Sequence, residues 1–435
     1  MNIAVVCGLI ILVLLVVMLL AGVPIAVALA VSSICAILPV LNLGASVLTG
    51  AQRIFSGISV FSLLAIPFFI LAGNIMNNGG IAIRLVNCAR LISGRLPGSL
   101  AQTNIVANML FGAISGSGTA AAAAIGGTMA PIELEEGYDK DYVAAVNIAS
   151  APTGQLIPPS NTLIVYATVA GSVSVAALFM AGYIPGIAWG ISLMFIAGYM
   201  AKKRGYVSTF SVTPKEAIKV LWDALPSLLL IIIVIGGILK GVFTATEGSA
   251  IAVVYALILS LCYRSLKIKD LPSIILSSCK TTCIVIFMIG VSSIMSWVMA
   301  YTMIPTAIAN AMLSLSSNKY VILLLMNVIL LVVGTFMDPT PAVLIFTPIF
   351  LPICQSFGMD PVQFGIMIVF NLCIGTITPP VGVILFTGCK VVGISIEGVI
   401  KTLLPFFAAI AVVLLLVTYV PAMSMWIPSM LGLVK

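Results

Sequence analysis

Apolar residues fill most of this chain in uninterrupted runs, and the runs have the length of membrane-spanning helices. A helix that crosses the hydrocarbon core of a bilayer needs ~20 such residues. A transmembrane β-barrel would instead show short segments of alternating polarity. The pattern therefore predicts an all-α polytopic membrane protein, with spans near residues 3–20, 23–41, 56–77, 224–242, 247–262, 281–300, 319–337 and 403–420.

Paired prolines interrupt two of the apolar regions, at residues 154–160 (GQLIPPS) and 375–380 (GTITPP). Proline lacks the backbone N–H and pushes the residue before it out of the helical conformation. Each helix should therefore break at membrane depth, and the freed peptide groups must face protein, water or a bound solute. Broken helices in matching positions of two halves point to the binding site of a transporter.

The two breaks belong to an internal repeat, in which one constant offset relates the regions 110–185 and 333–405. Glycine, proline and aspartate rarely coincide by chance in so apolar a chain. The offset alone leaves open whether the two copies run parallel or inverted. It carries Thr119 onto Thr340, Pro131 onto Pro352, Gly137 onto Gly358, Asp139 onto Asp360, Gly154 onto Gly375, Pro158 onto Pro379 and Pro159 onto Pro380.

Each copy also carries a short polar segment ahead of its break, at residues 115–119 (SGSGT) and 334–340 (GTFMDPT). The first could offer helix N-terminal amides to an anion, or could serve close helix packing through small residues. Asp338, in the second, ends an apolar span and is either functional or a cap of the following helix. The other acids, Glu133 among them, lie near turns and basic loops and are expected on the solvated surface.

Charge changes the picture in one respect, because only 7% of the residues are charged against about a quarter in soluble proteins. The basic residues cluster at 84–95, 202–204 and 264–269, which predicts a shared cytoplasmic side with the N-terminus outside. A nucleic-acid surface is not expected, because no basic stripe with interleaved aromatics occurs. Residues 213–216 (TPKE) have the form of a helix start, expected on a surface helix that links the halves.

Several kinds of chemistry find no support. The chain has no histidine, and its nine cysteines show no metal-site spacing and are expected to be packing residues. It also has no phosphate loop ending in Lys-Ser or Lys-Thr. An enzyme is therefore not expected. The breaks supply carbonyl and hydroxyl oxygens, which favour sodium as a coupling ion. A proton-coupled mechanism would need several buried acids or histidines, and no other cofactor is predicted.

The two breaks, residues 338–341 (DPTP), 347–352 (TPIFLP), 62–69 (SLLAIPFF) and 241–247 (GVFTATE) resemble the large membrane (M) subunit of TRAP (tripartite ATP-independent periplasmic) transporters. This resemblance covers almost the whole chain. It implies an elevator-type transporter with two inverted repeats, each with a re-entrant helical hairpin and a broken helix, in a bacterial inner membrane. It also implies sodium-driven uptake of an organic acid, with a small membrane (Q) subunit and a periplasmic substrate-binding protein as partners beside the lipid.

The resemblance assigns residues to sites and segments to domains. It implies scaffold helices at 1–80, a first transport-domain repeat at 81–200, scaffold and linking helices at 201–280, a second repeat at 281–402 and a C-terminal helix at 403–435. One sodium site would use Ser115, Gly154, Ile157 and Pro158, and the other Gly334, Gly375 and Thr378. The substrate would lie between them, near Ser117, Thr119, Asn161, Asp338 and Thr340.

Two positions at the implied substrate site depart from the family pattern. Thr119 stands where many members carry an acid, and residues 160–162 read Ser-Asn-Thr where many have Ser-Ile-Pro. The hydroxyls and Asn161 suit a sugar acid such as sialic acid, and a C4-dicarboxylate is the alternative. For the whole chain, the runner-up is a stand-alone sodium/divalent-anion symporter that needs no binding protein. An integral-membrane enzyme is disfavoured because the sequence shows no catalytic cluster. A non-transporting scaffold is disfavoured because it would not need two broken helices.

Overall fold

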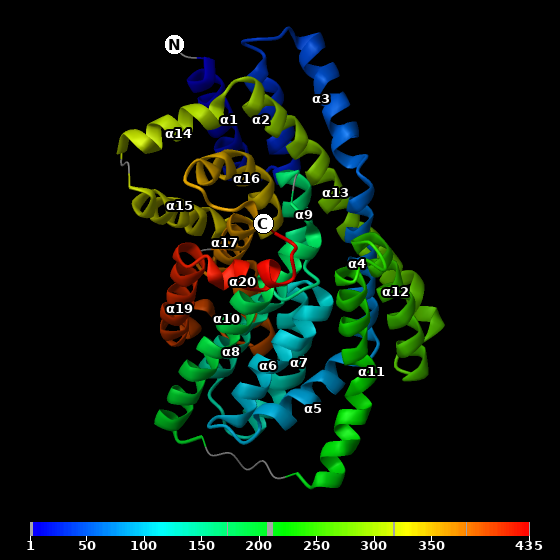
Figure 1. The fold of residues 1–435 in the computed structure, drawn as a ribbon. Coiled ribbons are helices and arrows are strands. Elements are labelled where there is room, and N and C mark those ends of the chain that lie inside the picture. The colour runs from blue at the N-terminus through cyan, green and yellow to red at the C-terminus, as the bar shows by residue number, and fades with distance from the viewer. Residues whose placement is uncertain (1–2, 172, 207–211, 316–317, 380, 435) are drawn as a thin grey trace.

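The computed structural model describes residues 3–171, 173–206, 212–315, 318–379 and 381–434, and this part of the chain folds into helices joined by short connections (Figure 1). The elements of the first half are α1 (Ile3–Leu20), α2 (Ile25–Ile37), α3 (Leu43–Ile58), η1 (Phe61–Leu64), α4 (Ala65–Asn78), α5 (Ile81–Ser93), α6 (Ser99–Ser115), α7 (Gly118–Glu135), α8 (Lys140–Ser150), η2 (Ala151–Gln155), α9 (Asn161–Ala170) and α10 (Val175–Arg204).

The second half follows the same plan. Its elements are α11 (Pro214–Leu239), α12 (Ala245–Cys262), η3 (Ile268–Asp270), α13 (Leu271–Tyr301), α14 (Ile304–Leu315), α15 (Lys319–Gly334), α16 (Pro339–Ser356), α17 (Pro361–Gly375), α18 (Val383–Val392), α19 (Ile396–Tyr419) and α20 (Ala422–Met430).

The predicted repeat is confirmed and is longer than the sequence shows. The offset that carries Pro158 onto Pro379 also carries both ends of α7 onto the ends of α16, and the start of α8 onto the start of α17. When the same offset is added to their residue numbers, α1 coincides with the second part of α11, and α2 falls within α12. The repeat therefore extends beyond the regions 110–185 and 333–405 to nearly the whole chain.

The two hairpins, α6–α7 and α15–α16, enter from opposite ends of the molecule. Figure 1 shows α6 and α7 in the lower half and α15 and α16 in the upper half. Residues from both tips line one cavity, so the tips meet near the middle. This arrangement confirms the inverted relation of the two repeats.

The first helix break forms at the predicted place, and neighbouring side chains pair its peptide groups. The α-helix stops at Ser150, a 3₁₀ turn follows, and α9 begins only at Asn161. The Ser160 hydroxyl donates to the Gln155 carbonyl across the break, and the Trp189 indole N–H donates to the Ala149 carbonyl at 3.0 Å. These bonds replace the intrahelical ones that the prolines prevent.

The second break, between α17 and α18, is completed by threonine hydroxyls and by a hairpin tip. Thr376 and Thr378 each donate a side-chain hydrogen bond of 2.7 Å to a carbonyl of α17. The Gly382 amide donates to the Thr335 carbonyl at the tip of the α15–α16 hairpin of the same repeat at 3.3 Å. Pro380, the second member of the predicted proline pair, lies outside the described residues.

Glycine pairs let each hairpin arm touch the break beside it. A Cβ atom at Gly154 would lie 2.1 Å from the Cα of Gly112, and one at Gly375 would lie 2.3 Å from the carbonyl carbon of Gly334. Real Cβ atoms are never so close to backbone, so only glycine fits at these crossings.

Buried amides hold the same arms and helices together one turn before each break. In the first repeat, Asn108 of α6 donates to the Ser150 hydroxyl of α8 at 2.9 Å. In the second, Asn371 of α17 donates to the Asn327 amide oxygen of α15 at 2.8 Å. Both repeats therefore use the same kind of polar contact to fix the hairpin against the broken helix.

Several helices begin or end at residues other than those predicted. Residues 213–216 begin α11 with the predicted capping box, but the helix continues to Leu239, so the linking helix and the span 224–242 are one element. The predicted run 56–77 is divided, since α3 ends at Ile58 and α4 starts at Ala65. The start of the predicted second transport repeat, residues 281–301, belongs to α13, which packs on α2, α3 and α4 as well as on α16. The C-terminal region contains α20 as well as the end of α19.

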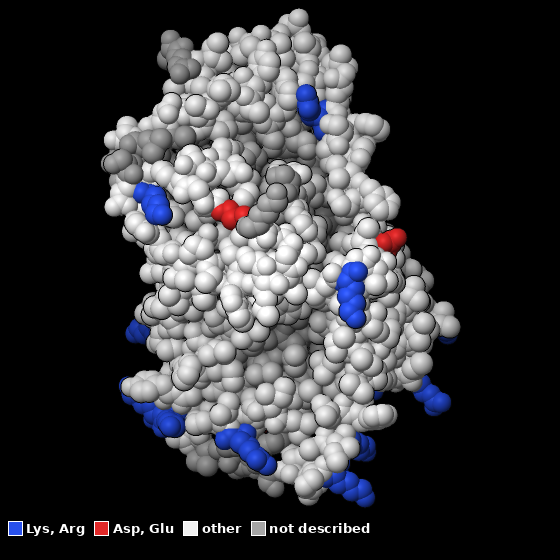
Figure 2. All heavy atoms as spheres, viewed as in Figure 1, with Lys and Arg blue, Asp and Glu red and all other residues white. Residues whose placement is uncertain are grey.

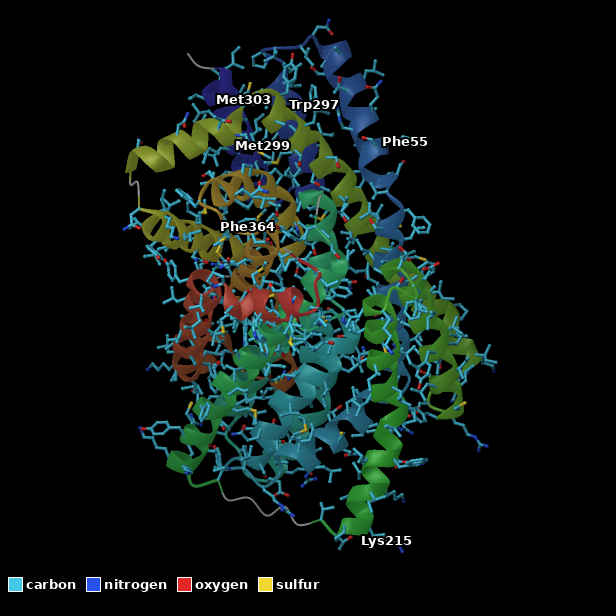
Figure 3. The ribbon with its side chains drawn as sticks, in the orientation of Figure 1. Phe55, Lys215, Trp297, Met299, Met303 and Phe364 are labelled. Atoms are coloured by element: carbon cyan, nitrogen blue, oxygen red, sulfur yellow. The ribbon has the colours of Figure 1, made fainter. Side chains whose placement is uncertain are left out.

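The basic clusters gather at one end, as predicted. Figure 2 shows lysine and arginine side chains around the lower end, where Figure 1 places α5, the end of α10 and the start of α11. Figure 3 shows Lys215 at the lower tip of α11. The N-terminal helix starts at the opposite end (Figure 1), as the positive-inside pattern predicts.

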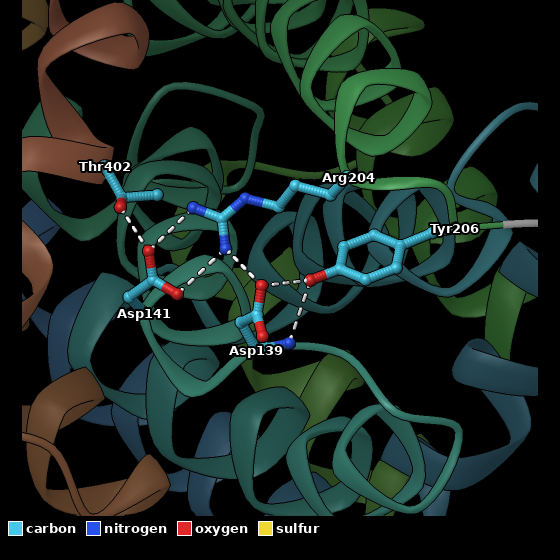
Figure 4. Close-up of polar contacts among 5 residues, drawn as sticks. All are labelled: Asp139, Asp141, Arg204, Tyr206 and Thr402. Carbon is cyan, nitrogen blue, oxygen red and sulfur yellow. Dashed lines mark hydrogen bonds and ion pairs between the residues drawn. The ribbon is translucent and has the colours of Figure 1, made fainter.

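A charged cluster at the basic end joins the two repeats (Figure 4). Arg204, at the end of α10, contacts Asp139 and Asp141, each at 2.7 Å, and the Thr402 hydroxyl of α19 donates to Asp141. The Tyr206 hydroxyl donates to Asp139 at 2.7 Å. Hydrogen bonds from the Arg204 guanidinium lower the pKa of Asp141 to about 2.

Alanine at Gly154 should destabilise the protein, because its Cβ would meet the backbone of Gly112. We expect a loss of roughly 1–3 kcal/mol, seen as a lower Tm of the purified protein in detergent. Gly127→Ala is the matched control, because a Cβ there meets nothing within 4 Å. An equal Tm for the two variants would contradict the close crossing.

Asp141→Asn should also lower the free energy of unfolding at neutral pH by about 1–3 kcal/mol, because it weakens a charge-assisted contact, and this loss should be seen as a lower Tm. The pKa of Asp141 is depressed in the folded protein, so its stabilisation is present above the unfolded value near 3.8 and is lost as pH falls towards 2. The Tm difference from wild type should thus be constant from about pH 5 to 8 and shrink below about pH 4. Asp223→Asn, on the exposed part of α11, should show no such difference.

Candidate functional site

A cavity of about 480 Å³ lies where the two hairpin tips meet the first break. All five residues predicted around the substrate line it, which brings together positions from the two distant repeats. The lining residues are Ile66, Ile70, Gly73, Asn74, Ser115, Gly116, Ser117, Thr119, Ala120, Gln155, Asn161, Thr162, Val165, Thr281, Val285, Asp338 and Thr340.

Three helices begin at this cavity, namely α7, α9 and α16. Their N-cap residues are Ser117, Ser160 and Asp338. The Ser117 hydroxyl accepts from the Ala120 amide at 3.3 Å, and the Ser160 hydroxyl accepts from the Leu163 amide at 3.4 Å. Helix N-termini carry partial positive charge, so three such ends face the cavity beside the Asp338 carboxyl, although the described lining includes no lysine or arginine.

Asp338 occupies an N-cap position without acting as a side-chain cap. Its backbone has the extended conformation typical of a cap, but its carboxylate makes no capping hydrogen bond. By contrast, the Asp360 carboxylate accepts from the Val362 amide at 2.7 Å. The neighbours of the Asp338 carboxyl are the amide and hydroxyl of Thr340, and its surface is open to the cavity. The geometry therefore favours the functional alternative for this side chain.

One wall of the cavity comes from α4 and α13, which sequence reasoning missed. It contains Asn74, whose amide donates to the Ser278 hydroxyl of α13 at 2.8 Å, and Gly73, where a Cβ would lie 3.2 Å from the Ser115 carbonyl oxygen. Thr281 and Val285 add to it from α13. A polar Asn74 within an apolar run was the available signal. Gln155 and Thr162 were also missed, although both stand within or beside the quoted break.

The first predicted ion set comes together at the hairpin tip. Gly154 packs against Gly112, and Gly112 lies three residues before Ser115 in α6. A Cβ at Gly116 would lie 3.0 Å from the Pro159 carbonyl oxygen. The Ile157 side chain turns away towards Gly186 of α10, which leaves its backbone as the part available at the break. Ser115, Gly154, Ile157 and Pro158 thus lie around one junction of α6 with the first break.

The second predicted ion set comes together in the same manner. Gly334 and Gly375 are in backbone contact, and a Cβ at Gly382 would lie 2.9 Å from the Thr378 carbonyl oxygen. Each set therefore places backbone carbonyls and a hydroxyl side by side, with no carboxylate among its members. Neutral oxygen donors of this kind suit a weakly charged hard cation.

The expectation that Glu133 lies on the solvated surface is wrong. Glu133 is fully buried near the end of α7, where the Asn104 amide donates to its two carboxylate oxygens at 3.4 and 3.2 Å. Asn104 in turn accepts from Asn108 at 2.8 Å. The surrounding apolar helices α6 and α8 enclose this network, which proximity to a turn in the sequence could not reveal.

Residues 12–423 match the family described as "Tripartite ATP-independent periplasmic transporter, DctM component". The chain belongs to this family. It is 53% identical over 409 residues to the uncharacterized protein YgiK of Salmonella typhimurium, covering 94% of each chain. It is 41% identical to the isethionate TRAP transporter permease protein DctMQ of Oleidesulfovibrio alaskensis, covering 93% of this chain and 64% of that protein.

A third relative is the sialic acid TRAP transporter large permease protein SiaM of Vibrio cholerae, 36% identical over 87% of this chain and 89% of that protein. Among solved structures, the YdaH transporter of Alcanivorax borkumensis has a similar fold, with a TM-score of 0.57, 13% identity and coverage of 87% of this chain and 88% of that one. This TRAP permease is an inner-membrane transporter and not an enzyme. In its described part, eight helices are long and apolar enough to cross a membrane.

Replacing Asp338 with alanine should reduce uptake by this TRAP permease at least ~10-fold, because the carboxylate faces the cavity and makes no capping bond. Tm should stay within a few degrees of wild type. The measurement is uptake of substrate into proteoliposomes, with Asp360→Asn as control, since asparagine keeps the capping bond. Wild-type uptake by the Asp338 variant would remove this residue from the site.

Proposed function

We propose that this permease performs sodium-coupled uptake of an organic acid anion, which a periplasmic binding protein delivers, by an elevator movement. The observation that carries the proposal is the single cavity shared by both hairpin tips, the first break and the α4–α13 wall. One face of the cavity would belong to a moving body made of the hairpins and the breaks, and the other face to α4 and α13. Both faces contribute polar groups to the cavity.

The anionic substrate would bind among Ser117, Thr119, Asn161, Asp338 and Thr340. The positive ends of α7, α9 and α16 would balance its charge, in the way that helix N-termini bind anions elsewhere. Asp338 would then accept a hydrogen bond from a neutral part of the substrate, because two anionic groups in direct contact would repel.

Two sodium ions would bind at the hairpin–break junctions described above. The first would use Ser115 with backbone groups of Gly154, Ile157 and Pro158, and the second would use Gly334, Gly375 and Thr378. Their charge would add to the helix dipoles, so that anion binding and sodium binding favour each other. This linkage explains why a site with no cationic side chain could still concentrate an anion.

The two hairpins and both breaks would move as one body. Tyr166 of the first repeat donates to the Pro361 carbonyl of the second, and Thr402 donates to Asp141 at the basic end. Such contacts would hold the repeats together while α3, α4 and α13 stay fixed in the membrane with a small membrane subunit. Exposed apolar side chains such as Phe55 of α3, 70% exposed and directed outward in Figure 3, would meet lipid or that subunit.

The relatives narrow the substrate class without fixing the compound. One is named for isethionate and another for sialic acid, and both compounds are acids that carry hydroxyl groups. A sugar acid or a hydroxysulfonate is therefore the first choice, and a C4-dicarboxylate is the alternative. A stand-alone symporter that needs no binding protein is the alternative mechanism.

Replacing external sodium with potassium should abolish concentrative uptake, because potassium is too large for sites built for sodium. The assay is accumulation of labelled acid in proteoliposomes with a sodium gradient, in the presence of the small subunit and the binding protein. Full accumulation driven by a proton gradient alone would overturn sodium coupling. Equal uptake with and without the binding protein would instead favour the stand-alone symporter.

A further inference from the structure

Gln155 lies in the first break and has a fixed orientation at the cavity. Its side-chain oxygen accepts a hydrogen bond from the buried Cys373 thiol of the second repeat at 3.0 Å. A thiol has one proton to donate, and the amide has one oxygen and one NH₂ group. The contact therefore assigns the oxygen to Cys373 and leaves the two N–H donors of Gln155 for the cavity that this residue lines.

Asn161, the first residue of α9, presents the opposite kind of group. Its side-chain oxygen is buried and has no hydrogen-bond donor within the described chain, although the residue lines the cavity. A buried acceptor without a donor is costly and is normally paired in native structures. An incoming ligand that donates a hydrogen bond would complete it.

The remaining polar groups make this division clear. Ser117 and Thr119 bond to each other at 3.1 Å, and Asn74 is bonded to Ser278. The Asp338 carboxylate makes no capping bond and can only accept when ionised. The cavity thus offers the N–H donors of Gln155, the unpaired side-chain oxygen of Asn161, and the Asp338 carboxylate, whose neighbours are the amide and hydroxyl of Thr340.

We infer that the substrate is an organic acid with a hydroxyl group close to its anionic group, and that Gln155 and Asn161 select it. This inference rests on the proposed function. The anionic group accepts from the Gln155 amide and the helix N-termini, and the hydroxyl donates to the Asn161 oxygen. Further hydroxyls donate to Asp338. Cys373 is a positioning residue, because it acts only by holding the Gln155 amide in one orientation.

The test uses matched pairs of acids that differ only in their hydroxyl groups: isethionate with ethanesulfonate, glycolate with acetate, and gluconate with hexanoate. Ligand-induced stabilisation of the purified permease in sodium buffer gives the half-saturating concentration of each. In the pair that fits the cavity, we expect the hydroxylated member to bind at least ~10-fold more tightly. Equal binding of both members would overturn this inference alone, whereas no sodium-dependent binding or uptake of any acid would overturn the proposed function as well.

Variants separate selection from folding. Asn161→Ala should reduce the preference for the hydroxylated member to within ~3-fold, because no acceptor remains to be paired. Cys373→Ala should weaken both members of a pair alike, and Cys373→Ser should restore binding, since a hydroxyl also donates. Asn78→Ala, at the exposed end of α4, is the amide control and should retain the full preference. An unchanged preference in Asn161→Ala, with Tm intact, would contradict the role given to this residue.

Discussion

Pairing of peptide groups inside an apolar environment is the constraint on which this architecture depends. The prolines of each break remove amide donors and interrupt the helical ladder, and no lipid can replace the missing bonds. Side chains do so instead: Ser160 and Trp189 at the first break, and Thr376 and Thr378 at the second. The breaks are thus ordered parts of the fold, and their geometry is available for binding because it is already stabilised.

The same constraint explains the glycines and amides beside the breaks. Hairpin backbones reach the breaks only where two glycines cross, at Gly112 with Gly154 and at Gly334 with Gly375. One turn away, a buried amide on the hairpin side of each repeat is tied to the helix that precedes the break. Small residues permit the approach and polar contacts fix its register, so that three helix N-termini point at a single cavity.

The sequence predicted the two helix breaks well because glycine, proline and aspartate form recognisable patterns at turns and helix ends. The two breaks and the constant offset between the repeats followed from them, whereas the resemblance to TRAP permeases implied the residues from Ser117 to Thr340 that line the cavity. Packing between helices that are distant in the chain produces no comparable pattern in the sequence. The α4–α13 wall, the thiol contact of Gln155 and the burial of Glu133 arise from helices that are distant in the chain. The length of α13 was also missed, since an apolar run does not reveal which neighbours it packs against.

The contacts that join the repeats are not themselves repeated. The offset between the repeats places Thr376 where Gln155 stands and Thr387 where Tyr166 stands, so neither the bond from Cys373 to Gln155 nor the bond from Tyr166 to Pro361 has a symmetric partner at these positions. Two identical half-proteins paired about a two-fold axis could form only contacts that occur twice. A single continuous chain is free of that restriction, so the first repeat can supply Gln155 while the second supplies the Cys373 thiol that holds it.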